Sequence, residues 1–307
     1  MRARGLVAAA VVASGALLVG GCGGSARHSA PKPPPGGSIA AILARPGANI
    51  TAVPGTNDYA AGPVRVSFLL IDNQGAPVNR ARARVWVAAS DDARPFAQTT
   101  ATLEPVGVPG SDAAAGDITR LYVAHFIVPR PGTYTVVAES TGPKPMQAEL
   151  HIQVREHPQA PAVGSQAIAS QTPTIASTHG NLKELTTRTP PDTALLRYSV
   201  AGSIAAHKPF VLVFATPKFC TSRTCGPVVD VVDAVRKQFA GSGIRFIHVE
   251  IYTDNNPGLP VNKWVKQWHL PTEPWTFLVG ADGRIKARFE GSVSTGELAA
   301  AVRQYLS

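Results

Sequence analysis

The chain has 307 residues, a length that predicts two domains, while its 27 prolines and 28 glycines indicate that part of it connects rather than packs. Hydrophobic residues make up 44% and aromatic residues 7%, which excludes a fully disordered chain and predicts cores filled mainly by Val, Leu, Ile and Ala. The formal net charge is +9, but Lys and Arg are scattered and form no basic helix, so we predict no nucleic-acid partner and instead a basic surface facing an anionic membrane.

The first residues have the pattern of a signal peptide. Two arginines precede the apolar run from Leu6 to Val19, which is shorter than the ~20 residues that a membrane-spanning helix needs. The run ends in Val19-Gly20-Gly21-Cys22, which resembles the lipobox at which bacterial lipoproteins are cleaved and acylated. The resemblance implies that residues 1–21 are removed and that a lipid on Cys22 holds the protein on the extracytoplasmic face of the cell membrane. An ordinary secretory signal with an incidental cysteine is the alternative.

The chain contains three cysteines. If Cys22 carries a lipid, Cys220 and Cys225 remain as an even pair in an oxidising compartment. Residues 22–57 are rich in Gly, Pro, Ser and Ala, and they include a Pro-Lys-Pro-Pro-Pro run that favours extended polyproline conformations. We therefore predict that residues 22–57 are a lipidated tether.

Residues 58–155 alternate between short apolar strands and turns. Apolar residues stand at every second position from Val64 to Leu70, which predicts a half-buried strand. Several short strands with Gly and Pro turns predict an all-β sandwich, and the stretch from Tyr122 to Tyr134 resembles immunoglobulin-like modules of extracytoplasmic bacterial proteins. His125 has no second ligand at a useful spacing, so no metal site is predicted there. The predicted strands are Val64–Ile71, Arg84–Ala88, Leu121–Val128, Thr133–Ala138 and Glu149–Val154.

Residues 156–180 return to Pro, Ala, Gln, Ser and Thr and are predicted to be an interdomain linker. Residues 181–307 form the second predicted domain, an α/β fold in which strands and helices follow in the order β-α-β-α-β-β-α. Its predicted elements are a strand at Phe210–Phe214, a helix from Pro227 to Phe239, a strand at Ile244–Tyr252, a helix at Val261–Trp268, strands at Trp275–Val279 and Ile285–Phe289, and a last helix opened by a capping box of Ser294 and Glu297.

This order resembles the thioredoxin superfamily, and three motifs make the resemblance specific. Cys220 and Cys225 follow the first central strand, Pro227-Val-Val-Asp230 lies in the next helix, and Glu273-Pro274 directly precedes a strand. The resemblance covers roughly Phe210 to Ser307. It implies that Pro274 is a cis-proline lying against the cysteine pair, with Glu273 and Pro274 taking part in substrate binding.

The chain departs from the family at two places. The family usually has two residues between its cysteines and this chain has four, and Val213 stands where thioredoxin has a buried acidic residue that aids proton transfer. Thiol exchange needs an exposed thiolate, and the helix N-terminus with Lys218 and Arg223 supplies positive potential that lowers a cysteine pKa. Cys220 is predicted to be the catalytic nucleophile and Cys225 the resolving cysteine that releases the substrate.

We therefore predict a membrane-anchored thiol-disulfide oxidoreductase whose partners are protein thiols or disulfides and which uses no cofactor and no metal. Two alternatives remain. In the first, Cys220 and Cys225 form a permanent disulfide in a binding module, although so short a loop gains little from closure entropy. In the second, the pair handles copper together with a histidine, for which His248 and His269 are the candidates.

Glu273 stands where the family commonly carries an uncharged residue, and two interpretations of it are open. It is either a solvated surface charge without a role or a charge that opposes thiolate formation at Cys220 and raises the pKa of that thiol. In the second case the pair is more reducing, and Glu273→Gln lowers the Cys220 pKa.

Overall fold

The computed structural model describes residues 36–110, 118–140, 142, 144–220 and 224–307. The predicted signal peptide, the predicted lipidation site Cys22 and Arg223 lie outside these residues. Residues Pro34–Ser307 form one compact unit. Among the helices of the described ranges, none combines the length and the apolar character that a membrane crossing requires.

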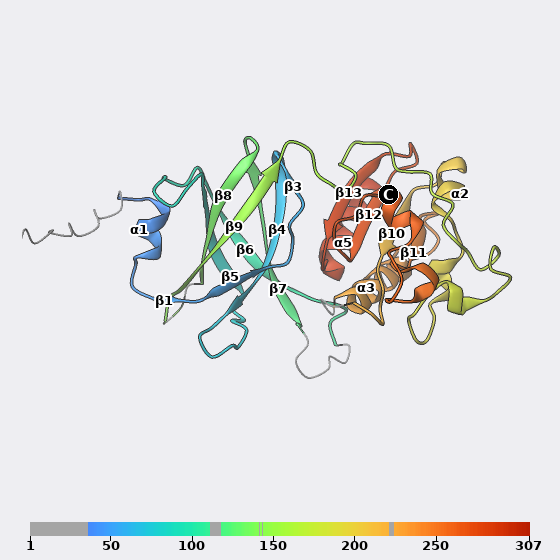
Figure 1. The fold of residues 1–307 in the computed structure, drawn as a ribbon, viewed down its shortest axis with the longest axis horizontal. Coiled ribbons are helices and arrows are strands. Elements are labelled where there is room, and N and C mark those ends of the chain that lie inside the picture. The colour runs from blue at the N-terminus through green and yellow to red at the C-terminus, as the bar shows by residue number, and fades with distance from the viewer. Residues whose placement is uncertain (1–35, 111–117, 141, 143, 221–223) are drawn as a thin grey trace, which may run out of the picture. The chain divides into compact units, whose positions relative to one another are not determined.

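The first part of this unit is a single, nearly closed β-sheet (Figure 1). Its path runs β1-β9-β8-β5-β6-β7-β4-β2, and β3 pairs with β9 off this path. Because β2 at one end of the path contacts β9 near the other end, the sheet curves back on itself around an apolar core. The strands are β1 (Ala48–Asn49), β2 (Thr51–Pro54), β3 (Tyr59–Ala60), β4 (Gly62–Ile71), β5 (Arg82–Ala88), β6 (Ala97–Pro105), β7 (Arg120–Val128), β8 (Gly132–Ser140) and β9 (Met146–Arg155).

This architecture supports the predicted all-β class but does not show the predicted immunoglobulin-like sandwich. The strands expected from alternating apolar residues are present as β4, β5, β7, β8 and β9, and their inward side chains form the core. They belong to one continuous sheet, however, and not to the two separate sheets that a sandwich needs. The all-β class is confirmed, whereas the immunoglobulin-like arrangement is not shown.

Part of the predicted tether is folded. Residues Ile39–Leu43 form the short helix α1, which begins where the Ser38 hydroxyl accepts a hydrogen bond from the Ala41 N–H. Ile39 and Ile42 are buried against Trp86 of β5, so the helix is held by apolar contacts. The strands β1 and β2 follow it, which places residues 48–54 in the sheet.

The second part contains a four-stranded sheet in the order β11-β10-β12-β13. The central strand β10 (Phe210–Phe214) runs parallel to β11 (Arg245–Val249) and antiparallel to β12 (Trp275–Val279), which pairs in turn with β13 (Ile285–Glu290). With the helices α3 (Cys225–Gln238), α4 (Lys263–Gln267) and α5 (Thr295–Tyr305), the predicted order β-α-β-α-β-β-α is confirmed. Ahead of β10 lie the short 3-10 helices η1 (Leu182–Glu184) and η2 (Thr193–Leu196) and the helix α2 (Val200–Ala205), and η3 (Thr253–Asn255) follows β11.

Each face of this sheet has its own apolar core. Val211 and Val213 of β10 point toward α3 and α5, while Phe210, Leu212 and Phe214 point toward α2 and α4. All five residues of β10 are fully buried, as a strand covered on both faces must be. Because successive side chains of β10 point to opposite faces of the sheet, this one strand contributes to the apolar contacts that hold the helices on both faces.

The predicted linker, residues 156–180, is fully described and has neither helix nor strand. It packs closely all the same, since Ala160 and Ala167 belong to a core of the second part and the Gly164 N–H donates to the Ile285 carbonyl. Glu290 of β13 also accepts hydrogen bonds from the backbone N–H groups of Asn57 and Asp58. The β-sheet part and the α/β part thus share polar contacts.

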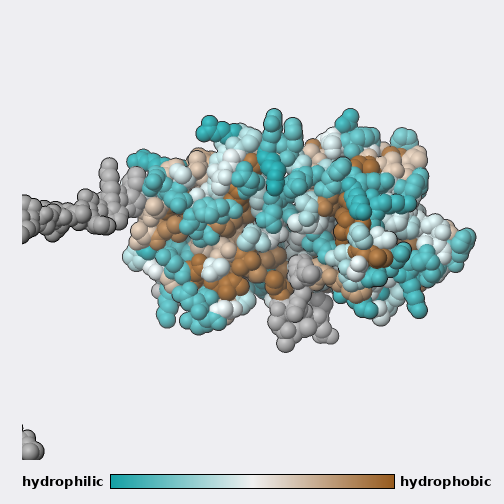
Figure 2. Space-filling model, in the orientation of Figure 1, coloured by the Kyte–Doolittle hydropathy of each residue, from teal (hydrophilic) through white to brown (hydrophobic). Residues whose placement is uncertain are grey.

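The surface has no single large apolar region on the face shown in Figure 2, where separate apolar patches lie between hydrophilic residues. The large apolar side chains that remain exposed come from different elements, which is ordinary for a folded domain. They are Val53, Phe96, Ile127, Val163, Tyr198, Leu259 and Tyr305.

Candidate functional site

The cysteine pair lies where β10 ends and α3 begins. β10 stops at Phe214, Cys220 follows six residues later, and the helix begins at Cys225. Cys225 is fully buried, whereas Cys220 is only half-buried. Of these two described cysteines, which are not joined by a disulfide, Cys220 is therefore the one within reach of another molecule.

The start of α3 contributes directly to the environment of Cys220. The Cys225 backbone N–H donates to the Cys220 Sγ over 3.3 Å. This N–H belongs to the first turn of a 14-residue helix, where backbone donors and the positive end of the helix dipole favour negative charge. A thiolate on Cys220 is stabilised by this contact.

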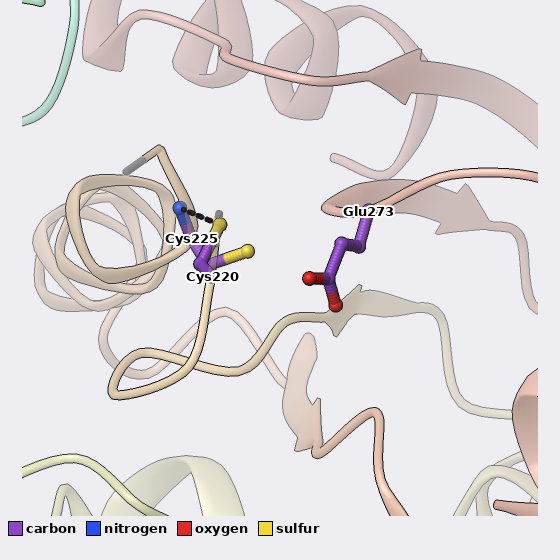
Figure 3. A group of neighbouring side chains, drawn as sticks. All are labelled: Cys220, Cys225 and Glu273. Carbon is purple, nitrogen blue, oxygen red and sulfur yellow. Dashed lines mark hydrogen bonds between the residues drawn. The ribbon is translucent and has the colours of Figure 1, made fainter. Parts of the chain in front are cut away.

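Strand pairing brings Glu273 to the same place. Trp275, the first residue of β12, pairs with Phe214, the last residue of β10, so the loop before β12 lies beside the loop that follows β10. The Glu273–Pro274 peptide bond is cis, as the resemblance implied. Figure 3 shows the Glu273 side chain pointing from this loop toward the two cysteines, and its carboxylate and the two sulfurs lie within 4.8 Å of one another.

These three groups perturb one another. A hydrogen bond with Cys220, burial and the negative charges of Cys220 and Glu273 all raise the pKa of Cys225 well above its usual range. Burial and the neighbouring charges of Cys220 and Glu250 raise the pKa of Glu273 to about 7. One Glu273 carboxylate oxygen, Oε2, is buried and has no hydrogen-bond partner among the described residues. The site therefore disfavours more than one negative charge at a time.

Glu250 is a second carboxylate near the pair, and the sequence analysis did not single it out. It directly follows β11, whose last residue, Val249, pairs with Phe214, so it lies at the same edge of the sheet as the cysteine loop. It is 5% exposed, and its Oε1 accepts hydrogen bonds from the backbone N–H and the hydroxyl of Thr187. An acidic residue directly after a predicted buried strand was the signal that could have identified it.

A groove of about 850 Å³ adjoins the cysteine loop. Phe219 and Gly226, the neighbours of Cys220 and Cys225, line it together with the segment Thr186–Thr189. This segment is fixed by an ion pair of 2.7 Å between Arg188 and Asp230 of α3. The Lys218 backbone N–H also donates to the Thr187 hydroxyl. The segment Thr186–Thr189, which precedes the part of the sequence that resembles thioredoxin, thus forms one wall of the groove beside the cysteines.

Among the described residues, the third side chain of a metal-ligating type beside the two cysteines is the Glu273 carboxylate and not a histidine. Two sulfurs and one oxygen within 4.8 Å could hold a thiophilic cation. His248 lies elsewhere, with its Nε2 at 3.0 Å from the Ala215 carbonyl. Neither His248 nor His269 belongs to the group, so the described residues do not supply the histidine that the copper alternative requires.

Comparisons with known proteins find similarity among solved structures. Neither a protein-family model nor a curated protein matches the chain. Among solved structures, a thiol:disulfide interchange protein of the thioredoxin family from Chlorobium tepidum TLS is similar to it, with 14% sequence identity and a TM-score of 0.30. The similarity covers 48% of this chain and 100% of that chain.

Proposed function

We propose that the chain is a thioredoxin-like protein that exchanges disulfides with protein substrates through Cys220 and Cys225. The observation that carries the proposal is the arrangement of the pair: a half-buried sulfur that accepts a helix N-terminal N–H, beside a buried thiol five residues later. A nucleophilic thiol must be accessible and stabilised as a thiolate, while a resolving thiol must be close and shielded from other disulfides.

The proposed reaction has two exchange steps. The Cys220 thiolate attacks one sulfur of a substrate disulfide, which forms a mixed disulfide and expels the other substrate sulfur as a thiolate. Cys225 then attacks the Cys220 Sγ, which forms the Cys220–Cys225 disulfide and releases the second substrate thiolate. The substrate disulfide gains two electrons and the cysteine pair loses two. The same steps in reverse oxidise a substrate dithiol.

The groove beside the cysteine loop is the proposed binding place of the substrate polypeptide. In this proposal Glu273, which lies beside the two sulfurs, and Pro274 bind the substrate, and Phe219 with the Thr186–Thr189 segment lines the groove that receives it. A chain segment bound there would carry its disulfide to Cys220. The charged residues that line the groove are of both signs, namely Lys183, Arg188, Lys218, Asp230 and Asp254.

The location and the role of the β-sheet part complete the proposal. We propose that lipid on Cys22 anchors the protein on the extracytoplasmic face of the cell membrane, where the pair can be oxidised. The β-sheet part then acts as a spacer or recognition module, in the place of the immunoglobulin-like module expected from the sequence. Its core is separate from the cores around the cysteine-bearing sheet, so it can vary in its surface without disturbing the site.

The test is to trap substrates on single-cysteine variants in the native membrane. Cys225→Ser retains the nucleophile and lacks the resolving thiol, so mixed disulfides should accumulate and should disappear when a reductant is added. Cys220→Ser is the matched control and should trap few or none. Equal absence of adducts in both variants would reject exchange and favour a structural disulfide, and tight stoichiometric Cu(I) binding by the reduced pair would favour copper handling.

A further inference from the structure

Closure of the internal disulfide poses a proton problem at Cys225. This thiol is fully buried; in the free pair a hydrogen bond with Cys220 raises the pKa of its sulfur, and burial, which persists in the mixed disulfide, raises it further. A thiol attacks a disulfide only as the thiolate, so Cys225 must lose its proton inside the protein before it can attack. The nearby sulfur of Cys220 cannot accept that proton at this stage, because it is then bonded to the substrate.

The Glu273 carboxylate is placed to accept the proton. It lies within 4.8 Å of both sulfurs, a distance that one bridging water or a small side-chain rotation closes. Its Oε2 is buried and lacks a hydrogen-bond partner among the described residues, so a lone pair is available inside the site. Glu250 is the other nearby carboxylate, and its Oε2 is likewise buried without a hydrogen-bond partner among the described residues, but Glu273 is the one that belongs to the group lying within 4.8 Å of both sulfurs.

We propose that Glu273 is a catalytic residue that accepts the Cys225 thiol proton while the mixed disulfide on Cys220 is resolved. This inference rests on the proposed exchange function and names the group that deprotonates Cys225 in its second step, the attack of Cys225 on the mixed disulfide. The Cys225 S–H bond breaks and its proton binds a Glu273 carboxylate oxygen, and the new thiolate forms the bond to the Cys220 Sγ. The bond between Cys220 and the substrate sulfur breaks, and the departing substrate thiolate takes up the proton from Glu273.

The acidity of Glu273 suits this role. A base works best when its pKa lies near the working pH, and burial with the charges of Cys220 and Glu250 raises the pKa of Glu273 to about 7. Once Cys220 is bonded to the substrate, its negative charge is gone. Glu273 can then ionise more easily, so it becomes a base at the step that needs one.

The two steps can be timed separately with 5,5′-dithiobis(2-nitrobenzoate), a small aromatic disulfide. The full chain carries Cys22→Ser in every sample to remove the third thiol. Attack of Cys220 on the reagent disulfide should expel one coloured thiolate, and attack of Cys225 on the resulting mixed disulfide should expel a second. The first phase depends on reagent concentration and the second does not. Cys225→Ser should show the first phase alone.

Glu273→Gln should speed the first phase, because loss of the carboxylate charge favours the Cys220 thiolate, and should slow the second phase at pH 7 by about 100-fold, a typical general-base contribution. Its second phase should then rise steadily with pH, without the inflection below pH 7 that ionisation of Glu273 gives the parent protein once Cys220 is bonded to the reagent. Glu273→Asp should recover part of the rate. Glu184→Gln removes an equal charge from an exposed position and should change neither phase.

The sign of the effect separates proton transfer from a purely electrostatic role. If Glu273 acted only through its charge, Glu273→Gln would make the Cys225 thiolate easier to form and would speed the second phase. An unchanged or faster second phase therefore overturns the inference while leaving the exchange function intact. Equal slowing of both phases would indicate a structural role and would also overturn it. Absence of the first phase would instead reject the proposed function itself.

Discussion

The buried carboxylate of Asp58 accepts hydrogen bonds from the predicted linker and from the α/β part, and its replacement by Asn should destabilise the protein. Its side chain is 1% exposed. The carboxylate accepts hydrogen bonds from the N–H groups of Gln159 (2.8 Å) and Ala160 (3.0 Å) and from Arg288 (3.0 Å), and Arg155 lies 3.8 Å away. Every one of these partners is a donor, so the site requires an acceptor on both oxygens.

Asp58→Asn keeps the size of the side chain but turns one oxygen into a donor. One backbone N–H of the pair Gln159 and Ala160 then faces an NH₂ group, and an unsatisfied buried donor costs about 1–3 kcal/mol. Arg288 also loses its counter-ion, although it still donates to the Ala160 and Asp58 carbonyls. Together these losses should lower the free energy of unfolding by about 3 kcal/mol, less than the full cost of breaking a buried ion pair.

The measurement is urea unfolding followed by circular dichroism, with thermal unfolding in parallel. A loss of about 3 kcal/mol corresponds to a decrease in Tm of about 6–12 °C for a protein of this size. Asp72→Asn is the control, because half-buried Asp72 accepts hydrogen bonds from two backbone N–H groups through one oxygen, which Asn can replace. A loss below about 1 kcal/mol for Asp58→Asn, or one equal to that of Asp72→Asn, would refute this reasoning.

Three further predictions concern the anchor and the site. Cys22→Ser should abolish lipid attachment and lipobox processing; normal processing of this variant, with no lipid on the parent protein by mass spectrometry, would exclude the anchor. Glu273→Gln should lower the Cys220 pKa, measured from thiolate absorbance, and an unchanged or higher value would leave Glu273 without an electrostatic effect on that thiol. Because burial raises the pKa of Glu273 to about 7, the stability that this group contributes is complete below its unfolded pKa near 4.5 and is lost as the pH rises through 7. The free energy of unfolding should therefore fall less steeply between pH 5 and 8 in Glu273→Gln than in the parent, and identical slopes would contradict the raised pKa.

The buried strands of the α/β part could be predicted well because their sequences are apolar throughout. Phe210–Phe214 and Trp275–Val279 begin and end where expected, since strands covered on both faces need a continuous apolar run. A third predicted strand is present but shorter at both ends: the strand expected at Ile244–Tyr252 is observed as Arg245–Val249. The capping box was half right, because Ser294 accepts from the Glu297 N–H while the Glu297 carboxylate binds Arg65 instead.

The β-sheet part was harder to predict, for identifiable reasons. The strand β6 carries Thr and Gln at alternate positions and buries only Ala101, so it has no apolar period to detect. The strands β1 and β2 are two and four residues long and mostly exposed, and they lie in a segment whose Gly and Pro content predicts a tether. Closure of the sheet depends on contacts between distant strands, which local periodicity does not encode.

The candidate site was predictable in its residues but not in its geometry. The positions of Cys220, Cys225 and Glu273 followed from the order of elements and from Pro274. The burial of Cys225, the acceptor role of the Cys220 sulfur and the presence of Glu250 depend on how the ends of three strands meet. These features depend on the three-dimensional arrangement of the strand ends, which the spacing of residues along the chain does not specify.

The reduction potential of the Cys220/Cys225 pair tests the exchange function most directly. The full chain would be equilibrated with glutathione and dithiothreitol buffers of known potential, and the oxidised fraction counted by alkylation and mass spectrometry. An exchanging pair should have a potential between about −120 and −270 mV, the range of proteins that oxidise, reduce or isomerise disulfides. A potential below about −300 mV would mark an inert structural disulfide and contradict the proposal.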